Sequence, residues 1–165
     1  MEPPLGRRLY LGHRAVHDVL DDRMGERGAS LWNWILLRTA AEHEGSSQRE
    51  VAAHMHIEPP SLVRHLDQLA DEGLVERRRD EQDRRVTRVY LTPAGRRRLT
   101  ELQGIAEAVD DELRELLTAR EVEVLGRALM RIHDHFADRG TGPGVDPRVQ
   151  AKAELEEIRR GHARR

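Results

Sequence analysis

The chain has 165 residues, a formal net charge of −2 and no cysteine. This length suits one compact domain or one subunit of a dimer whose core is partly shared. The missing thiols exclude disulfides, thiolate metal sites and thiol redox sensing. No apolar run approaches the roughly 18 residues of a membrane span and no signal peptide opens the chain, so we expect a cytoplasmic protein without membrane contact.

Four helices are predicted in the first half of the chain. Helical spacing of apolar residues begins at Leu5. Ser30 is a cap for the second helix, and Ser47 with Glu50 forms a capping box for the third. Two prolines at the first helical positions open the fourth, which stops at Gly73. The predicted ranges are about 5–24, 31–43, 47–55 and 59–72.

After Gly73 the hydrophobic period changes. The segments "LVERRR" and "RVTRVYL" flank the polar turn "DEQD" and predict a two-stranded ribbon over residues 74–91. Thr92 then caps a helix with Pro93 in its first turn, and the capping box "TARE" at 118–121 opens the last helix. The remaining residues are a linker and a polar tail over 141–165.

Both long helices after the ribbon carry apolar seams with spacings of three and four residues. The seam residues are Leu99, Leu102, Ala106, Val109, Leu113 and Leu116, and then Val122, Leu125, Leu129, Ile132 and Phe136. Such seams usually pack on partner helices, so we expect a homodimer joined through residues 1–29 and 99–140. The alternative, that these helices pack only within one chain, stays open.

The order helix, turn, helix, ribbon is that of a winged helix-turn-helix, here over residues 30–98. The predicted class is therefore mainly α, with a small β component (α+β), in which the N- and C-terminal helices form a helical dimerisation region. The fourth helix turns leucines inward and is wholly polar on its opposite face. That face carries Ser61, Arg64, His65 and Gln68.

A recognition helix needs such a face, because its N-terminal residues offer donors to base edges in the major groove. Arg64 can bond both acceptors of a guanine, Ser61 can reach a base or a phosphate, and the Pro60 ring can touch a thymine methyl. An ordinary amphipathic helix with a solvated polar face looks the same. The polar face alone therefore does not decide between the two interpretations.

The charge around the ribbon favours nucleic-acid binding. Residues 77–98 hold nine arginines against three acids, whereas residues 99–140 hold five arginines against ten acids. A basic wing beside a polar helix face can reach phosphates and the adjacent minor groove, so we expect double-stranded DNA as the partner.

The segment "DRRVTRVYLTPAG" resembles the signature of the MarR family of bacterial regulators, and "IEPPSLVRHLDQLADEGLVER" is similar to its SlyA-type members. The resemblance covers about residues 1–140. It implies a dimeric winged-helix transcription factor on a pseudo-palindromic site, with Pro60, Ser61 and Arg64 in the major groove. Arg84 and Arg85 would enter the minor groove. His65 replaces a small hydroxyl residue of the SlyA-type proteins.

Members of the family bind small aromatic carboxylates such as salicylate, so the resemblance also implies an effector pocket. Arg14 and Trp34 match pocket residues of the SlyA-type proteins, and Arg38 falls where those proteins have a histidine. Tyr10, Arg14 and His17 share one face of the first helix. A guanidinium can pair with the carboxylate and an indole can cover the aromatic ring.

Three other functions compete with that of a ligand-responsive regulator. His13 and His17 have the spacing of a helical zinc pair, which leaves a metal-responsive regulator as an alternative, although we expect no metal or other cofactor. An architectural DNA protein without an effector is the second alternative. An enzyme is not expected, because no nucleophile–base pair, glycine-rich phosphate loop or pair of acids in a plausible cleft is evident.

Overall fold

The computed structural model of the protein describes residues 3–55 and 57–137. Within them the chain forms helices and one two-stranded antiparallel sheet, which confirms the predicted mainly α fold with a small β component. The predicted tail over 141–165 lies outside the described residues. The elements are α1 (Leu5–Gly25), α2 (Leu31–Glu42), α3 (Gln48–His54), α4 (Pro59–Asp71), β1 (Val75–Arg79), β2 (Thr87–Leu91), α5 (Pro93–Leu116) and α6 (Ala119–Ala137).

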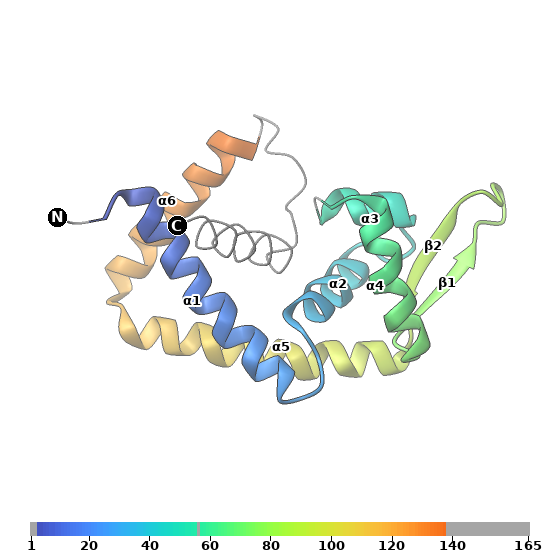
Figure 1. Cartoon of the computed structure of the whole chain (residues 1–165), viewed down its shortest axis with the longest axis horizontal. Coiled ribbons are helices and arrows are strands. Elements are labelled where there is room, and N and C mark those ends of the chain that lie inside the picture. The colour runs from blue at the N-terminus through green and yellow to red at the C-terminus, as the bar shows by residue number, and fades with distance from the viewer. Residues whose placement is uncertain (1–2, 56, 138–165) are drawn as a thin grey trace, which may run out of the picture.

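The elements form two lobes along α5 (Figure 1). The helices α2, α3 and α4 and the β1–β2 sheet gather near the start of α5, whereas α6 leaves its far end and α1 crosses it between. One apolar core connects the lobe formed by α2, α3, α4 and the sheet to the helices α1 and α5, because it includes Met24 of α1 and Leu102 of α5. Its other large, fully buried side chains are Leu36, Leu37, Val51, Leu62, Leu66, Leu69 and Val89.

The helix starts carry the hydrogen bonds that their sequence signals predict. The Ser30 hydroxyl accepts a hydrogen bond from the Asn33 N–H at 3.2 Å. Ser47 and Glu50 each accept from the other's backbone N–H, at 3.2 and 2.7 Å, and the same reciprocal box recurs at 118–121. Local capping chemistry therefore sets these boundaries.

The ribbon is confirmed, but its turn is longer than predicted. β1 and β2 pair from Val75 with Leu91 to Arg79 with Thr87, so the turn covers 80–86 rather than "DEQD" alone. The Asp80 and Asp83 carboxylates accept hydrogen bonds from backbone N–H groups inside the turn, and the Asp80 N–H donates to the Val86 carbonyl at 2.9 Å where the turn leaves the ribbon.

A short third segment extends the sheet beside β2. The Gly45 N–H donates to the Val89 carbonyl and the Val89 N–H donates to the Ser46 carbonyl, both at 3.0 Å. Gly45 has a φ of +81°, a left-handed conformation that favours glycine. The loop between α2 and α3 is thereby attached to the wing.

Thr92 and Gly95 fix the start of α5 to the end of α4. The Thr92 hydroxyl donates to the Gly73 carbonyl at 2.7 Å and accepts from the Gly95 N–H at 3.0 Å. A Cβ atom at Gly95 would lie 1.9 Å from the Leu74 carbonyl oxygen, so only glycine fits without a backbone shift. This contact positions the base of the wing against α5.

The apolar seams of α5 and α6 differ in burial. Leu102 and Val109 of α5 are buried, but Leu125, Leu129 and Phe136 of α6 are exposed by 44%, 43% and 49%. A single copy of the chain therefore leaves the seam of α6 facing solvent.

Candidate nucleic-acid interface

Helix α4 separates an apolar face from a polar one as predicted. Leu62, Leu66 and Leu69 are buried, whereas Ser61 and Arg64 are exposed. Pro60 is exposed at the first turn, and the exposed Gln68 donates a hydrogen bond to Glu72 at 3.0 Å. Within the described residues Arg64 makes no ion pair. The guanidinium of Arg64 is thus available to an external acceptor.

His65 differs from the other residues of the polar face. Its ring is half-buried and stacks on Trp32 of α2, with 5.8 Å between the ring centroids and 11° between the planes. His65 lies on the predicted polar face of α4, but the indole of Trp32 covers part of its imidazole ring. His65 therefore packs against α2, whereas Ser61 and Arg64 are exposed.

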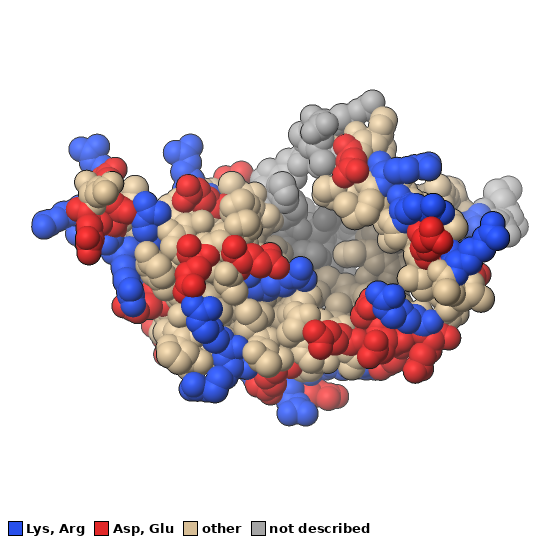
Figure 2. Space-filling view, turned by 180° about the vertical axis from the view of Figure 1, so that it is seen from behind, with Lys and Arg blue, Asp and Glu red and all other residues tan. Residues whose placement is uncertain are grey.

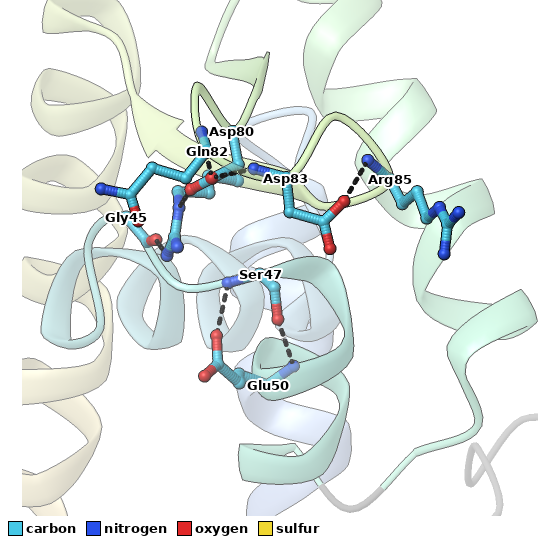
Figure 3. Close-up of polar contacts among 8 residues, drawn as sticks. Gly45, Ser47, Glu50, Asp80, Gln82, Asp83 and Arg85 are labelled. Atoms are coloured by element: carbon cyan, nitrogen blue, oxygen red, sulfur yellow. Dashed lines mark hydrogen bonds and ion pairs between the residues drawn. The ribbon is translucent and has the colours of Figure 1, made fainter.

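The wing tip is held by carboxylates of the turn (Figure 3). Asp80 accepts from the Asp83 N–H at 2.8 Å and from the Gln82 N–H at 2.9 Å, and Asp83 accepts from the Arg85 N–H at 3.0 Å. The Asp83 N–H, the Arg88 guanidinium and the Gln82 N–H hold the pKa of the Asp80 carboxyl below its usual range. The turn is therefore ordered by charged acceptors.

The nine arginines around the ribbon divide into two groups. Five make ion pairs within the chain: Arg77 with Asp67 (2.5 Å), Arg78 with Glu76 (2.7 Å), Arg88 with Asp80, Arg96 with Glu44 (2.5 Å) and Arg98 with Glu101 (2.7 Å). Four make no ion pair with any acid in the described part of the chain: Arg79, Arg84, Arg85 and Arg97.

Ion pairing therefore reduces the charge that the ribbon offers to a polyanion. Figure 2 agrees, because basic and acidic side chains lie side by side over the face that it shows. Arg84 and Arg85 are exposed at the wing tip, and neither has an ion-pair partner among the described residues. These two residues are the ones that the resemblance assigned to the minor groove.

The residues predicted to bind an effector fall into two separate groups. Trp34 and Arg38 lie together in a groove of about 340 Å³ that is also lined by Val16, Leu20 and Gln103. The Arg38 guanidinium carbon is 5.7 Å from the centroid of the Trp34 ring, and the Trp34 indole donates to Gln103 at 3.3 Å. This groove lies between α1, α2 and α5.

Tyr10, Arg14 and His17 lie on α1 and do not line this groove. Arg14 is 3.6 Å from the Asp18 carboxylate. His17 is largely buried, with 18% of its side chain exposed, and its ring centroid is 5.8 Å from that of His13. Within one chain the structure therefore places Trp34 and Arg38 in one groove, whereas Tyr10, Arg14 and His17 lie outside it.

The described residues provide neither a metal centre nor a membrane span. Among them no group of three histidine, aspartate or glutamate side chains is placed to hold a metal ion, so the spacing of His13 and His17 has no third ligand there. No helix among the same residues combines the length and apolarity needed to cross a bilayer.

The helix pair α3–α4 followed by the β1–β2 wing defines a winged helix-turn-helix protein. Residues 31–87 match the MarR family. This match covers the winged-helix region of the chain and supports the resemblance that its sequence motifs carry. That family consists of DNA-binding transcription factors, which confirms the expectation that the chain is not an enzyme. The finer resemblance to the SlyA-type regulators stays a prediction.

Solved structures of similar fold include three proteins bound to DNA. The transcriptional repressor CouR bound to a 23-mer DNA duplex has 28% identity and a TM-score of 0.73, over 78% of this chain and 92% of CouR. A mutant of MarR from E. coli, complexed with operator DNA, has 24% identity and a TM-score of 0.72, over 78% and 93%. The MepR–DNA complex from S. aureus has 18% identity and a TM-score of 0.74, over 81% and 99%, and it shows a shared fold alone, as does the MarR mutant.

The contacts that anchor the wing were not predicted from the sequence. Arg88 joins Asp80 to the carbonyl of Gly45, which is 43 residues away. The alternation of β2 places Arg88 on the face opposite the buried Val89, but no local pattern reveals a partner at that separation.

Proposed function

We propose that this protein is a sequence-specific transcriptional regulator that binds a pseudo-palindromic operator as a homodimer. The observation that carries this proposal is the placement of free arginines. Arg64 stands on the outer face of α4, and Arg84 and Arg85 stand at the wing tip, each without an internal ion pair in the described chain. A regulator of this kind acts where the bacterial chromosome lies, in the cytoplasm.

In this proposal α4 reads the major groove and the wing reads the minor groove. Ser61 and Arg64 reach base edges, Pro60 contacts a thymine methyl, and Gln68 and His65 lie further along the helix. Arg84 and Arg85 enter the minor groove, where A·T-rich tracts concentrate negative potential. Since His65 stacks on Trp32, we expect it to contribute less to base recognition than Arg64 does.

The two-fold symmetry of a homodimer would match that of the proposed operator. We assign residues 1–29 and 99–140 to dimerisation and residues 30–98 to DNA binding. The exposed apolar seam of α6 supports this division, because Leu125, Leu129 and Phe136 have no cover in one chain. A two-fold axis through the helical lobe would present two recognition helices to half-sites about one helical turn apart, roughly 34–36 Å.

The test compares Arg64→Ala with the wild-type protein on two duplexes. One is recovered by selection from random sequences with the wild-type protein, and the other is its scrambled version. We expect Arg64→Ala to cost about 1–3 kcal/mol on the selected duplex and much less on the scrambled one, because a base contact is sequence-specific. Fluorescence anisotropy titrations measure both affinities.

Arg131→Ala is the matched control, since Arg131 is an exposed arginine of α6, away from the winged-helix lobe, and its loss removes the same charge. It should leave both affinities nearly unchanged. Equal losses on the two duplexes for Arg64→Ala would remove this residue from base reading. A wild-type protein that binds both duplexes equally would favour the architectural alternative.

We also propose that a small aromatic carboxylate such as salicylate lowers the affinity for DNA. The groove beside Trp34 and Arg38 supports this, because it offers an indole face and a guanidinium between α5 and the winged-helix lobe. Arg38 is paired with Glu42 at 2.8 Å, so a carboxylate ligand must compete with that contact.

Calorimetry with salicylate tests the effector. Arg38→Gln should weaken the binding of salicylate, and it should reduce the effect of salicylate on the DNA complex. Arg14→Ala asks whether Arg14 and its neighbours Tyr10 and His17, which lie outside the groove in one chain, take part. Absence of any heat of binding would refute salicylate as the ligand.

A further inference from the structure

Arg88 bonds two segments that are far apart in the sequence. Its guanidinium donates through Nε to the Asp80 carboxylate and through Nη1 to the Gly45 carbonyl, at 2.8 Å for the latter. Asp80 begins the wing turn, whereas Gly45 belongs to the loop between α2 and α3. One planar side chain therefore joins the tip of the wing to the helix-turn-helix unit.

Further hydrogen bonds hold both acceptors of Arg88, the Asp80 carboxylate and the Gly45 carbonyl, in place. Asp80 orders the turn through the backbone N–H groups of Gln82 and Asp83. Gly45 is bonded to Val89 of β2, and the capping box of Ser47 with Glu50 anchors the loop to α3 (Figure 3). A displacement of the tip relative to α3 would therefore break the bonds of Arg88.

The position of Arg88 within the ribbon is electrostatically unfavourable, and no residue of its own strand compensates for this. Arg88 pairs directly across the ribbon with Arg78, and like charges in this position destabilise a sheet. Arg78 pairs with Glu76 of its own strand at 2.7 Å and lies 4.8 Å from the centre of the Tyr90 ring on β2. Arg88 instead turns towards Asp80 and Gly45.

We propose that Arg88 is a positioning residue for DNA binding, which fixes the wing tip relative to α3 and α4 through its bonds to Asp80 and Gly45. This inference rests on the proposed function. The last paired residues of the ribbon are Arg79 and Thr87, so the turn that carries Arg84 and Arg85 extends beyond the ladder. Arg88 orders that turn before DNA is met, which lowers the entropy lost when Arg84 and Arg85 enter the groove.

The readout is a ratio of two affinities measured by anisotropy. One duplex is that selected by the wild-type protein, and the second replaces its A·T flanks, where the wing would lie, with G·C pairs. We expect Arg88→Gln to reduce the preference for the A·T-flanked duplex about tenfold, since the wing arginines are no longer placed. Arg88→Lys should be intermediate, because one ammonium cannot reproduce the planar fork.

Arg78→Gln is the matched control. Arg78 lies on the opposite strand and hydrogen-bonds Glu76 of that strand. Its substitution removes the same charge but leaves the bonds of Arg88 to Asp80 and Gly45 in place, so the ratio should stay at the wild-type value. Adding Arg84→Ala to Arg88→Gln should cause little further loss, because both changes remove the same contact.

A variant that is merely less stable loses affinity for both duplexes by the same factor. An unchanged ratio in Arg88→Gln, or losses that add fully with Arg84→Ala, would overturn the positioning role while leaving the proposed function intact. A wild-type protein that shows no preference among duplexes would overturn the proposed function and this inference together.

Discussion

Arg84 and Arg85 lie at the wing tip, and neither guanidinium group forms an ion pair with an acid in the described part of the chain. We expect Arg84→Ala to weaken DNA binding and to reduce the slope of the logarithm of affinity against the logarithm of salt concentration by about one. Arg77→Ala is the comparison, because Arg77 is neutralised by Asp67 and should change the slope less. Titrations at several salt concentrations measure the slopes, and an unchanged slope for Arg84→Ala would place the wing off the DNA.

Gly95 leaves no space for a side chain. Its absent Cβ would lie 1.9 Å from the Leu74 carbonyl oxygen, so we expect Gly95→Ala to lower the free energy of unfolding by about 1–3 kcal/mol. Gly104→Ala on the same helix has no atom within 4 Å of its Cβ and should stabilise by about 0.5–1 kcal/mol. Urea denaturation compares the two variants. A Gly95→Ala protein as stable as the wild type would contradict the close approach of α5 to Leu74.

Asp80 links protein stability to pH. Its folded-state pKa lies below the ordinary value of about 3.9, so its contribution to stability is complete above that value and is lost as the pH falls through the lowered pKa. Asp80→Asn lacks this contribution at neutral pH. We therefore expect the difference in unfolding free energy between wild type and Asp80→Asn to shrink on acidification below about pH 4. Denaturant unfolding across the pH range measures it, and a constant difference would show that the carboxylate charge has no part.

At the scale of elements, the sequence predicted what local chemistry determines. The caps at Ser30, Ser47, Thr92 and Thr118 place the helix starts correctly, because each hydroxyl bonds a backbone N–H only three residues away. The wing turn was underestimated, because Arg85, Val86 and Thr87 alternate polar and apolar residues as a strand does. The Asx-type hydrogen bonds of Asp80 and Asp83 decided against the strand there.

The exposed seam of α6 belongs to the same scale. If this seam is the dimer interface, Leu129→Asp should convert a dimer into a monomer, because a carboxylate would be buried without a partner. Arg131→Asp changes a residue outside the seam and should leave the dimer intact. Sedimentation velocity distinguishes the two states. A Leu129→Asp protein that stays dimeric would show that α6 does not join the subunits.

At the scale of the whole molecule, contacts between distant segments decide the site, and these could not be predicted. The hydrogen bond of Trp34 to Gln103 spans 69 residues, and that of Arg88 to Gly45 spans 43. The sequence placed Trp34 and Arg38 one turn apart on one helix, but it could not show that α5 completes their groove or that Tyr10, Arg14 and His17 stay outside it. Helical periodicity predicts the face of the helix on which a residue lies. It does not predict which distant residue packs against that face.

In the proposed function, two copies of this chain read one symmetric DNA sequence. Selection of duplexes from a random library with the wild-type protein tests whether such a sequence exists. We expect enrichment of a two-fold symmetric sequence with half-sites about 10 base pairs apart, which the protein prefers over random DNA by about 10³-fold or more. Recovered duplexes without a common sequence, or bound no better than the starting library, would contradict sequence-specific binding by a symmetric dimer.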